Sequence, residues 1–462
     1  MVALPPVLLI ALPLLFAFLA PLVGMVSRRM VKLYTLLVLI LNALLSILLF
    51  INVMANGVVY EQLSGFYPPV GILLSVGYLG AILAVLINVL SPVVYLSYFG
   101  EAENSVKFSM LYMLVTASST GIVITGDLFN MFVFFEITAV GSYGLVASLR
   151  TKEAFEGSFK YIVLGSIGSA FILMGIATIY GYLKTLNFYD IALRIDTMPE
   201  TARLMSFIFL IVGIGVEAEI FPLNGWVPDA YQGASNRVAS FLSVGPSKAG
   251  IYAIARLIFT LIPIMSGFEL SLLLGIFTLV VGELAALRQR DVKRMLAYSS
   301  IGQMGLILIA LSLHSETALV AAVFLMVGHA LAKSILFIGS RDYSGGLLRN
   351  PLIAGPLFLG VLSIVGMPPF PGFWGKWYLM VDLASRGAWT IILLIVFTAI
   401  VEGVYYSRYL FRGLNGEIRT LTKSEIASII ILASILILIG LFPQYLYDPA
   451  VMAARSLLGG GP

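Results

Sequence analysis

The chain has no cysteine, and His314 and His329 are the only histidines among its 462 residues. Without a thiolate it cannot form a disulfide or ligate an iron–sulfur cluster through cysteine. Two histidines are too few for chains of bis-histidine haems or for a histidine-rich metal site. The sequence also contains no nucleotide-binding loop. We therefore expect no cofactor, no metal site and no redox centre within this chain; enzymatic activity would belong to a complex around it.

Charged residues are also scarce, at 11% of the chain, against about 25% in soluble domains. Hydrophobic residues make up 60%, and the mean hydropathy is +1.03. Many apolar runs approach the ~20 residues that a helix needs to cross the hydrocarbon core. The net charge of +4 implies no nucleic acid partner, because basic residues collect in the cytoplasmic loops of membrane proteins. The composition predicts an all-α polytopic membrane protein surrounded by lipid.

Polar loops divide the sequence into about fourteen transmembrane helices. The predicted spans are 3–24, 31–53, 69–97, 107–125, 127–148, 159–183, 204–223, 237–262, 269–288, 295–314, 317–339, 352–385, 390–411 and 425–446. The first lacks the basic start of a signal peptide and is longer than a signal-peptide core, so we interpret it as a span. The loops are short and hold no soluble domain. The longest outer loop, 184–203, is predicted to contain a surface helix.

The basic residues predict the orientation. Alternate loops on one side hold eighteen of the 27 Lys and Arg, the opposite side holds six, and three lysines lie within spans. Because basic loops stay in the cytoplasm, we predict that both termini face outward from a cell (plasma) membrane.

Two spans contain helix-breaking residues. The seventh is interrupted near Pro222 and Pro228, and the twelfth near Pro368 and Pro371. Lipid tolerates such breaks only where the freed backbone groups face protein or a wet cavity. Paired breaks in two halves indicate inverted repeats around an ion or substrate site. The predicted divisions are helices 1–3 in 1–106, a first five-helix repeat (helices 4–8) in 107–262, a second (helices 9–13) in 269–412, and helix 14 in 425–446.

Ionisable residues inside the predicted spans are few and expensive to insert. The candidate proton-relay residues are Glu136, Glu217, Lys248, His329, Lys333, Lys376 and Glu402. His329 and Lys333 are four residues apart and share a helix face. Buried Lys, His and Glu side chains that water bridges can pass a proton in small free-energy steps. The alternative for each is a structural ion pair or packing contact.

Several other acids are interpreted as structural. Glu219 is expected to reach a loop or a lipid headgroup, and Glu283 to pair with Arg288 or Arg290 near the inner surface. Asp229 and Asp382 lie near the ends of their spans.

Five motifs resemble one known family. They are GDLFNMFVFFEITAVGSYGL, FPLNGWVPDAYQGASNRVASFLSVGPSKAGIYAIAR, RDVKRMLAYSSIGQMGLILIAL, HALAKSILFIGS and GMPPFPGFWGKWYLM. They look like the antiporter-like subunits shared by Mrp-type cation/proton antiporters, respiratory complex I and membrane-bound hydrogenase or sulfur-reductase complexes, and most of all like the D-type Mrp subunit and its archaeal relatives. The resemblance implies a fourteen-helix plan without a long lateral helix.

The resemblance also implies a function. The chain would translocate protons, with coupling to redox chemistry or cation exchange elsewhere in the complex. Its partners would be other membrane subunits, including further antiporter-like chains, and its ions protons or sodium. Glu136 matches a glutamate that tunes a lysine in helix 7, Lys248 a bridging lysine and Lys376 the lysine at the outer exit. His329 and Lys333 lie in the segment that links the two half-channels.

The chain departs from the family at the helix 7 lysine. The family pattern GIKAAVFPL is GVEAEIFPL here, so the lysine position is Glu217, and Asn224 stands where relatives often have histidine. Two close carboxylates tend to share one proton, and we predict that Lys248 bridges them as the partner of Glu136.

Three functional hypotheses remain. In the first, the chain conducts protons and its first half-channel relays them through an acid pair. In the second, that half has lost its pump cycle and the chain only bridges other antiporter-like subunits. The third, a solute permease, explains the broken helices but not the row of ionisable groups.

Overall fold

The structure is a computed structural model that describes residues 5–63, 65–66, 68–100, 105–340, 350–414 and 421–459. Arg341, Arg349 and Arg419, which contribute to the predicted orientation, lie outside these residues.

The described chain is almost entirely helical, which confirms the predicted all-α class. In chain order the helices are α1 (Leu8–Val26), α2 (Arg28–Asn56), α3 (Tyr78–Leu96), α4 (Ser105–Ile124), α5 (Leu128–Val146), α6 (Lys152–Leu183), α7 (Phe188–Arg194), α8 (Glu200–Glu217), α9 (Val227–Gly233), α10 (Asn236–Val244), α11 (Pro246–Arg256), α12 (Met265–Arg288), α13 (Val292–Ser312), α14 (Glu316–Gly339), α15 (Pro351–Val365), α16 (Pro371–Ser385), α17 (Trp389–Leu414), α18 (Lys423–Leu441) and α19 (Gln444–Leu458). Strands β1 (Val59–Gln62) and β2 (Leu73–Val76) pair antiparallel between α2 and α3.

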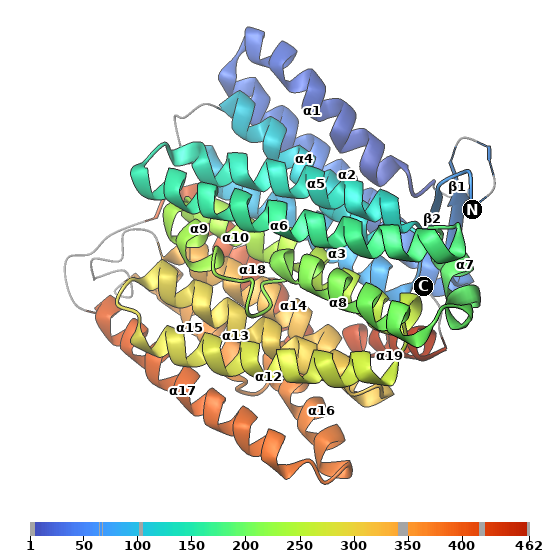
Figure 1. Cartoon of the computed structure of the whole chain (residues 1–462). Helices are drawn as coiled ribbons and strands as arrows, with labels where there is room; N and C mark the ends of the chain where they lie inside the picture. Colours follow the sequence, from blue (N-terminus) through green and yellow to red (C-terminus); the bar gives the residue numbers. More distant parts are fainter. Residues whose placement is uncertain are drawn as a thin grey trace.

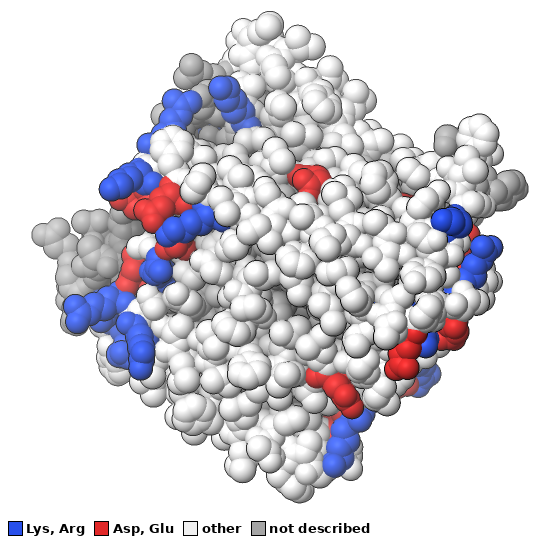
Figure 2. Space-filling view, viewed as in Figure 1, with Lys and Arg blue, Asp and Glu red and all other residues white. Residues whose placement is uncertain are grey.

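The long helices lie side by side, and both ends of the chain lie at the same side of the bundle as the β1–β2 hairpin (Figure 1). The loop 184–203 contains the short helix α7, as predicted. Most charged side chains gather at the two ends of the helices, and a broad, nearly uncharged band separates them (Figure 2). This distribution fits a slab of hydrocarbon around the middle of the bundle.

Eleven helices in the described part are long and apolar enough to cross a membrane. The predicted spans outside this set are 204–223, 237–262 and 352–385, and each coincides with a short or interrupted helix. The chain is therefore a polytopic membrane protein, while the count of fourteen remains a prediction.

The predicted breaks are present. After α8 ends at Glu217 the chain turns through Glu219, whose φ is +62°, before α9 begins at Val227. After α15 the chain turns at Gly366, whose φ of +91° suits glycine, before α16 begins at Pro371.

A third interruption divides the predicted eighth span. Helix α10 ends at Val244 and α11 begins at Pro246, which has no N–H to continue the helical ladder. A π-helical turn at Leu257–Leu261 follows α11.

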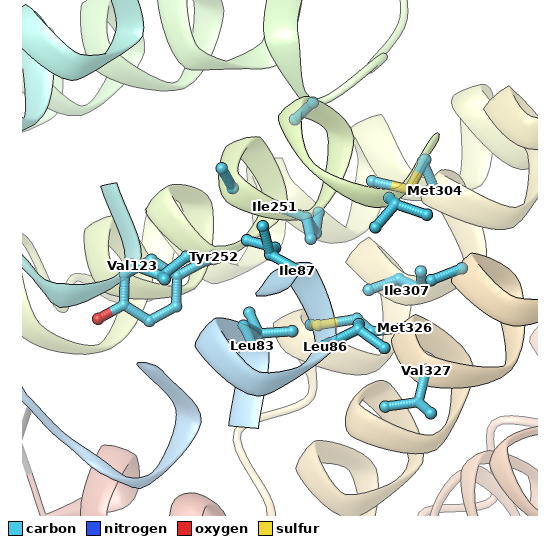
Figure 3. Packing of buried hydrophobic residues seen from close by; sticks show 14 of the residues in the cluster. Leu83, Leu86, Ile87, Val123, Ile251, Tyr252, Met304, Ile307, Met326 and Val327 are labelled. Atoms are coloured by element: carbon cyan, nitrogen blue, oxygen red, sulfur yellow. The ribbon is translucent and has the colours of Figure 1, made fainter. Parts of the chain in front are cut away.

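The centre of the bundle is formed by α14 and α13. Every residue of α14 from Ala318 to Gly339 is buried, and so are most residues of α13. Figure 3 shows the packing around them. Leu83 and Leu86 of α3 lie close to Met326 of α14, and Ile251 of α11 lies close to Ile87 of α3. Because protein surrounds α14, its polar residues His329 and Lys333 are screened from lipid.

Candidate functional site

Lys248 of α11 and His329 of α14 form a direct contact at the centre of the bundle. Lys248 Nζ lies 2.8 Å from His329 Nδ1, and the other ring nitrogen of His329 lies 3.0 Å from Ser300 Oγ. Both side chains are at most 2% exposed. Lys248 Nζ also donates to the carbonyl of Ser243, 3.1 Å away, at the end of α10. The break between α10 and α11 thus supplies an acceptor for the buried ammonium.

The predicted pairing of Lys248 with Glu136 is wrong. Glu136 is the only acid of α5, it is half-buried, and it accepts a hydrogen bond from the hydroxyl of Ser169 in α6. The prediction failed because sequence spacing does not reveal that the amine of Lys248 points toward α14.

Glu217 is buried where α8 ends. Its carboxylate accepts a hydrogen bond of 2.7 Å from the hydroxyl of Tyr161. The Tyr161 ring stacks on Trp226, with 3.5 Å between centroids and 4° between planes. Trp226 Nε1 in turn donates to the carbonyl of Val216 at the end of α8. The broken helix therefore fixes the aromatic pair that holds Glu217.

Glu219 is also buried, contrary to the predicted loop or headgroup contact. It is 1% exposed and accepts a hydrogen bond of 2.6 Å from the hydroxyl of Tyr231. Its other oxygen has no hydrogen-bond partner among the described residues. Ser300 and Lys248 both neighbour this carboxylate. The turn after α8 directs Glu219 toward the central Lys248–His329 contact.

Lys376 of α16 and Glu402 of α17 form an ion pair in the second half. Lys376 Nζ lies 2.5 Å from Glu402 Oε2, and both residues are at most 6% exposed. The ammonium also donates to the carbonyls of Ile364 and Val365, which end α15. Gln303 of α13 donates to the other oxygen of Glu402. Here too a broken helix provides carbonyl acceptors for a buried lysine.

Lys333 has partners other than His329, although the two share a face of α14. Its amine donates to the carbonyl of Leu296 at 2.9 Å and to the hydroxyl of Tyr406 at 3.1 Å. Tyr406 therefore connects Lys333 to α17, the helix that also contains Glu402.

Glu283 of α12 does not pair with Arg288 or Arg290 as predicted. It is completely buried and accepts a hydrogen bond of 2.8 Å from the hydroxyl of Tyr405. The carboxyl group faces the bundle interior, with one oxygen against Gly302 of α13 and the other against Tyr405 of α17.

A charged cluster surrounds Asp229 of α9 and includes residues of α6 and α13. Lys160 Nζ lies 2.7 Å from Asp229, and Arg294 pairs with its other oxygen. These three charged side chains are partly exposed, whereas Lys248 and Lys376 are buried. Asp229 lies in the short helix α9, after the break that follows α8.

The sequence does not single out the hydroxyl groups at the site. Tyr161, Ser300, Tyr405 and Tyr406 contact candidate relay residues or Glu283, yet each stands in an apolar helical run, where serine and tyrosine are ordinary packing residues. In the described part no group of three or more His, Cys, Asp or Glu could hold a metal ion.

Comparison with known proteins gives consistent matches. Residues 125–401 match the family described as NADH:quinone oxidoreductase/Mrp antiporter, TM. The chain is 30% identical over 367 residues to NADH-quinone oxidoreductase subunit N of Desulforudis audaxviator, covering 75% of this chain and 73% of the relative. It is 32% identical over 356 residues to the D-type subunit of the Na(+)/H(+) antiporter of Alkalihalophilus pseudofirmus, covering 73% and 72%.

Among solved structures, a chain of the membrane-bound sulfane sulfur reductase, an archaeal respiratory membrane complex, superposes with a TM-score of 0.92. It is 36% identical to this chain, and the alignment covers 98% of this chain and 97% of that one.

Proposed function

Because the chain belongs to the NADH:quinone oxidoreductase/Mrp antiporter transmembrane family, we propose that it translocates protons as an antiporter-like subunit of a multisubunit membrane complex. The proposal rests on one observation above all. Lys248, His329, Lys333, Lys376 and Glu402 are buried in the middle of the bundle and are held by hydrogen bonds from broken or neighbouring helices. Intramembrane ionisable groups that are buried and partnered in this way are typical of ion pathways and proton relays.

The relay runs along a row of seven residues in two halves. The first half holds Glu136 and Glu217, the centre Lys248 and His329, and the second half Lys333, Lys376 and Glu402. At the centre an imidazole between an ammonium and a hydroxyl can accept a proton at one nitrogen and release one at the other. This property suits His329 to join the two halves.

The first half works with carboxylates in place of a lysine. Glu217 accepts from Tyr161 and Glu136 accepts from Ser169, so each acid faces a hydroxyl on α6. Tyr161 and Ser169 are eight residues apart, about 12 Å along the axis of α6. A proton is exchanged between the two acids through water that bridges this gap.

Two features support the inverted repeat in this proposal. In the proposed repeat, α5 and α13 are each the second helix of a five-helix unit. Both begin after an N-cap aspartate, Asp127 and Asp291, that accepts from the backbone N–H three residues on, at 2.8 Å. The interruptions after α8 and α15 occupy the fourth helix of each unit.

The proposed setting is a plasma membrane with both chain ends outside. Sulfane sulfur reductase, NADH-quinone oxidoreductase and Na(+)/H(+) antiporter complexes all contain relatives of this chain. Other membrane subunits, including further antiporter-like chains, are therefore its proposed partners. Protons are the proposed ion, with sodium as the counter-ion if the complex is an antiporter.

The test is proton flux in vesicles that contain the assembled complex. Lys376→Ala removes the ammonium of the second half, and Glu136→Ala removes the half-buried carboxylate of the first. Each variant is expected to lower ion-coupled turnover, while complex assembly is followed by size-exclusion chromatography. Unchanged flux in both assembled variants would overturn the proposal and favour a subunit that only bridges its neighbours.

A further inference from the structure

A continuous chain of hydrogen bonds joins Lys333 to Glu283 through three hydroxyl groups. Lys333 Nζ lies 3.1 Å from Tyr406 Oη, and Tyr406 Oη lies 3.0 Å from Ser299 Oγ. Ser299 Oγ lies 2.8 Å from Tyr405 Oη, which lies 2.8 Å from Glu283 Oε2. Four helices contribute these groups: α14, α17, α13 and α12. Since residues distant in sequence build the chain, its continuity is a property of the fold.

The donors and acceptors of this chain can all be satisfied in one direction. A hydroxyl group has one proton to donate and lone pairs to accept with, an ammonium only donates and a carboxylate only accepts. Lys333 donates to Tyr406, Tyr406 to Ser299, Ser299 to Tyr405, and Tyr405 to Glu283. Every hydroxyl then donates once and accepts once, which is the arrangement that a proton wire requires.

The five residues are isolated from solvent and lipid. Lys333, Ser299, Tyr406 and Glu283 are 0% exposed, and Tyr405 is 2% exposed. Burial protects the polar chain from competing hydrogen bonds and makes each contact stronger than it would be in water. Side chains of this polarity cost free energy to bury unless they are paired, and here the partners are one another.

The Glu283 end of the chain approaches a small cavity through Tyr405. A small cavity at the turn between α12 and α13 has a volume of about 10 Å³, which is near the minimum for one water molecule. Tyr405 lines it together with Gln289 and Arg290. One oxygen of Glu283 has no hydrogen-bond partner within the described residues, although the residue is completely buried. The cavity meets the chain of hydrogen bonds at Tyr405, whose hydroxyl contacts Glu283, so a water molecule there would lie close to an acid that still has a free acceptor among the described residues.

We propose that the Glu283–Tyr405–Ser299–Tyr406 chain is a proton inlet that loads Lys333 from the α12–α13 end of the bundle. This inference rests on the proposed proton translocation and adds four residues that no part of the predicted relay includes. Water that enters by the cavity beside Tyr405 gives a proton to the unpartnered oxygen of Glu283, and rotation of the resulting carboxylic acid brings this proton to the side that faces Tyr405. Glu283 then gives a proton to Tyr405 as Tyr405 gives its own to Ser299, Ser299 to Tyr406, and Tyr406 to neutral Lys333.

One transfer leaves Glu283 as a carboxylate and Lys333 as an ammonium. Each of the three hydroxyl oxygens gives away one proton and receives another, so all three groups remain hydroxyls. They end with every hydroxyl donating in the direction from Lys333 to Glu283, opposite to the direction before the transfer. Rotation of the hydroxyl groups before the next proton arrives completes the cycle.

The test uses tyrosine-to-phenylalanine variants of the assembled complex in vesicles. Tyr405→Phe and Tyr406→Phe each remove one hydroxyl group and leave the ring that packs between the helices. Because each interrupts the hydrogen-bonded path from Glu283 to Lys333, each should lower proton flux at least about tenfold, in the range of a lost proton-transfer group. Tyr112→Phe is the matched control: Tyr112 is 1% exposed and its hydroxyl donates to the carbonyl of Ser91, outside the inlet.

Infrared difference spectroscopy gives a second readout that a structural effect alone would not produce. A pH step should change the carboxylic acid band of Glu283 in the unsubstituted complex and in Tyr406→Phe, and Glu283→Gln should abolish that band. Proton flux within twofold of the unsubstituted complex in both phenylalanine variants would overturn the inlet. If Lys376→Ala and Glu136→Ala still lower flux, the inlet alone has failed; if neither does, the proposed function has failed as well.

Discussion

The Lys376 ammonium lies 2.5 Å from a carboxylate oxygen of Glu402, and both residues are buried between α16 and α17. Removing both charges from water is costly, and only good geometry with further hydrogen bonds compensates. The two carbonyls at the end of α15 and the amide of Gln303 provide those bonds. The break between α15 and α16 is therefore part of the site, because an intact helix would leave no free carbonyls for the lysine.

Function and stability can be separated at this pair. Lys376→Met leaves Glu402 buried without its cation, and breaking a buried pair costs roughly 3–5 kcal/mol, so the complex should lose stability as well as proton flux. Lys376→Met combined with Glu402→Leu removes both charges and should recover most of the thermal midpoint without recovering flux. Thermal unfolding and vesicle flux measured on the same preparations check this. Recovery of flux in the double variant would contradict a role of the pair in transport.

His329 should be required where the other histidine is not. His329 contacts Lys248 and Ser300 with its two ring nitrogens, so His329→Leu removes the link between them. Proton flux should fall at least about tenfold, as expected for a positioned proton-transfer group.

The matched control is His314→Gln. His314 is exposed after α13, where it stacks with Phe259 and Phe268. If His329→Leu transported protons as fast as His314→Gln and the unsubstituted complex, the Lys248–His329 contact would have only a structural role.

An ion pair between α10 and α18 should contribute mainly to stability. Arg237 and Glu425 lie 2.6 Å apart, and their side chains are 5% and 1% exposed. Glu425→Gln leaves the buried guanidinium without its carboxylate, which should cost about 3 kcal/mol or more and lower the Tm of the complex. Glu316→Gln is the control, because Glu316 pairs with Arg455 at the surface, where such pairs contribute little. A lower Tm for Glu316→Gln than for Glu425→Gln would contradict the role of burial.

Sequence patterns predicted the features that depend on the chain locally. Apolar runs predicted the spans, proline and glycine predicted the interruptions after α8 and α15, and mid-span charges predicted buried groups such as Lys376 and Lys248. These signals are local because the hydrocarbon core penalises charge and free backbone groups wherever they occur along the chain.

Partner choice could not be predicted in the same way. Lys248 contacts His329, 81 residues away, and Glu283 contacts Tyr405, 122 residues away. Such contacts depend on how α11 and α12 rotate about their axes, and a shift of one residue changes the direction of a side chain by about 100° in a helix with 3.6 residues per turn. Glu219 was misplaced for a related reason, because its positive φ redirects the chain after α8.

Glu217 stands where the family pattern has lysine, and its role in transport can be tested directly. If the first half relays protons through acids, Glu217→Gln removes a titratable group while it keeps a hydrogen bond to Tyr161, and proton flux should fall at least about tenfold. Glu217→Lys restores a titratable group at the same position, and its amine can donate to the Tyr161 hydroxyl. Flux in the lysine variant should therefore exceed that in the glutamine variant, as measured in vesicles with equal amounts of assembled complex. The acid relay would be wrong if both variants transported protons as fast as the unsubstituted chain, since the first half would then have no part in transport.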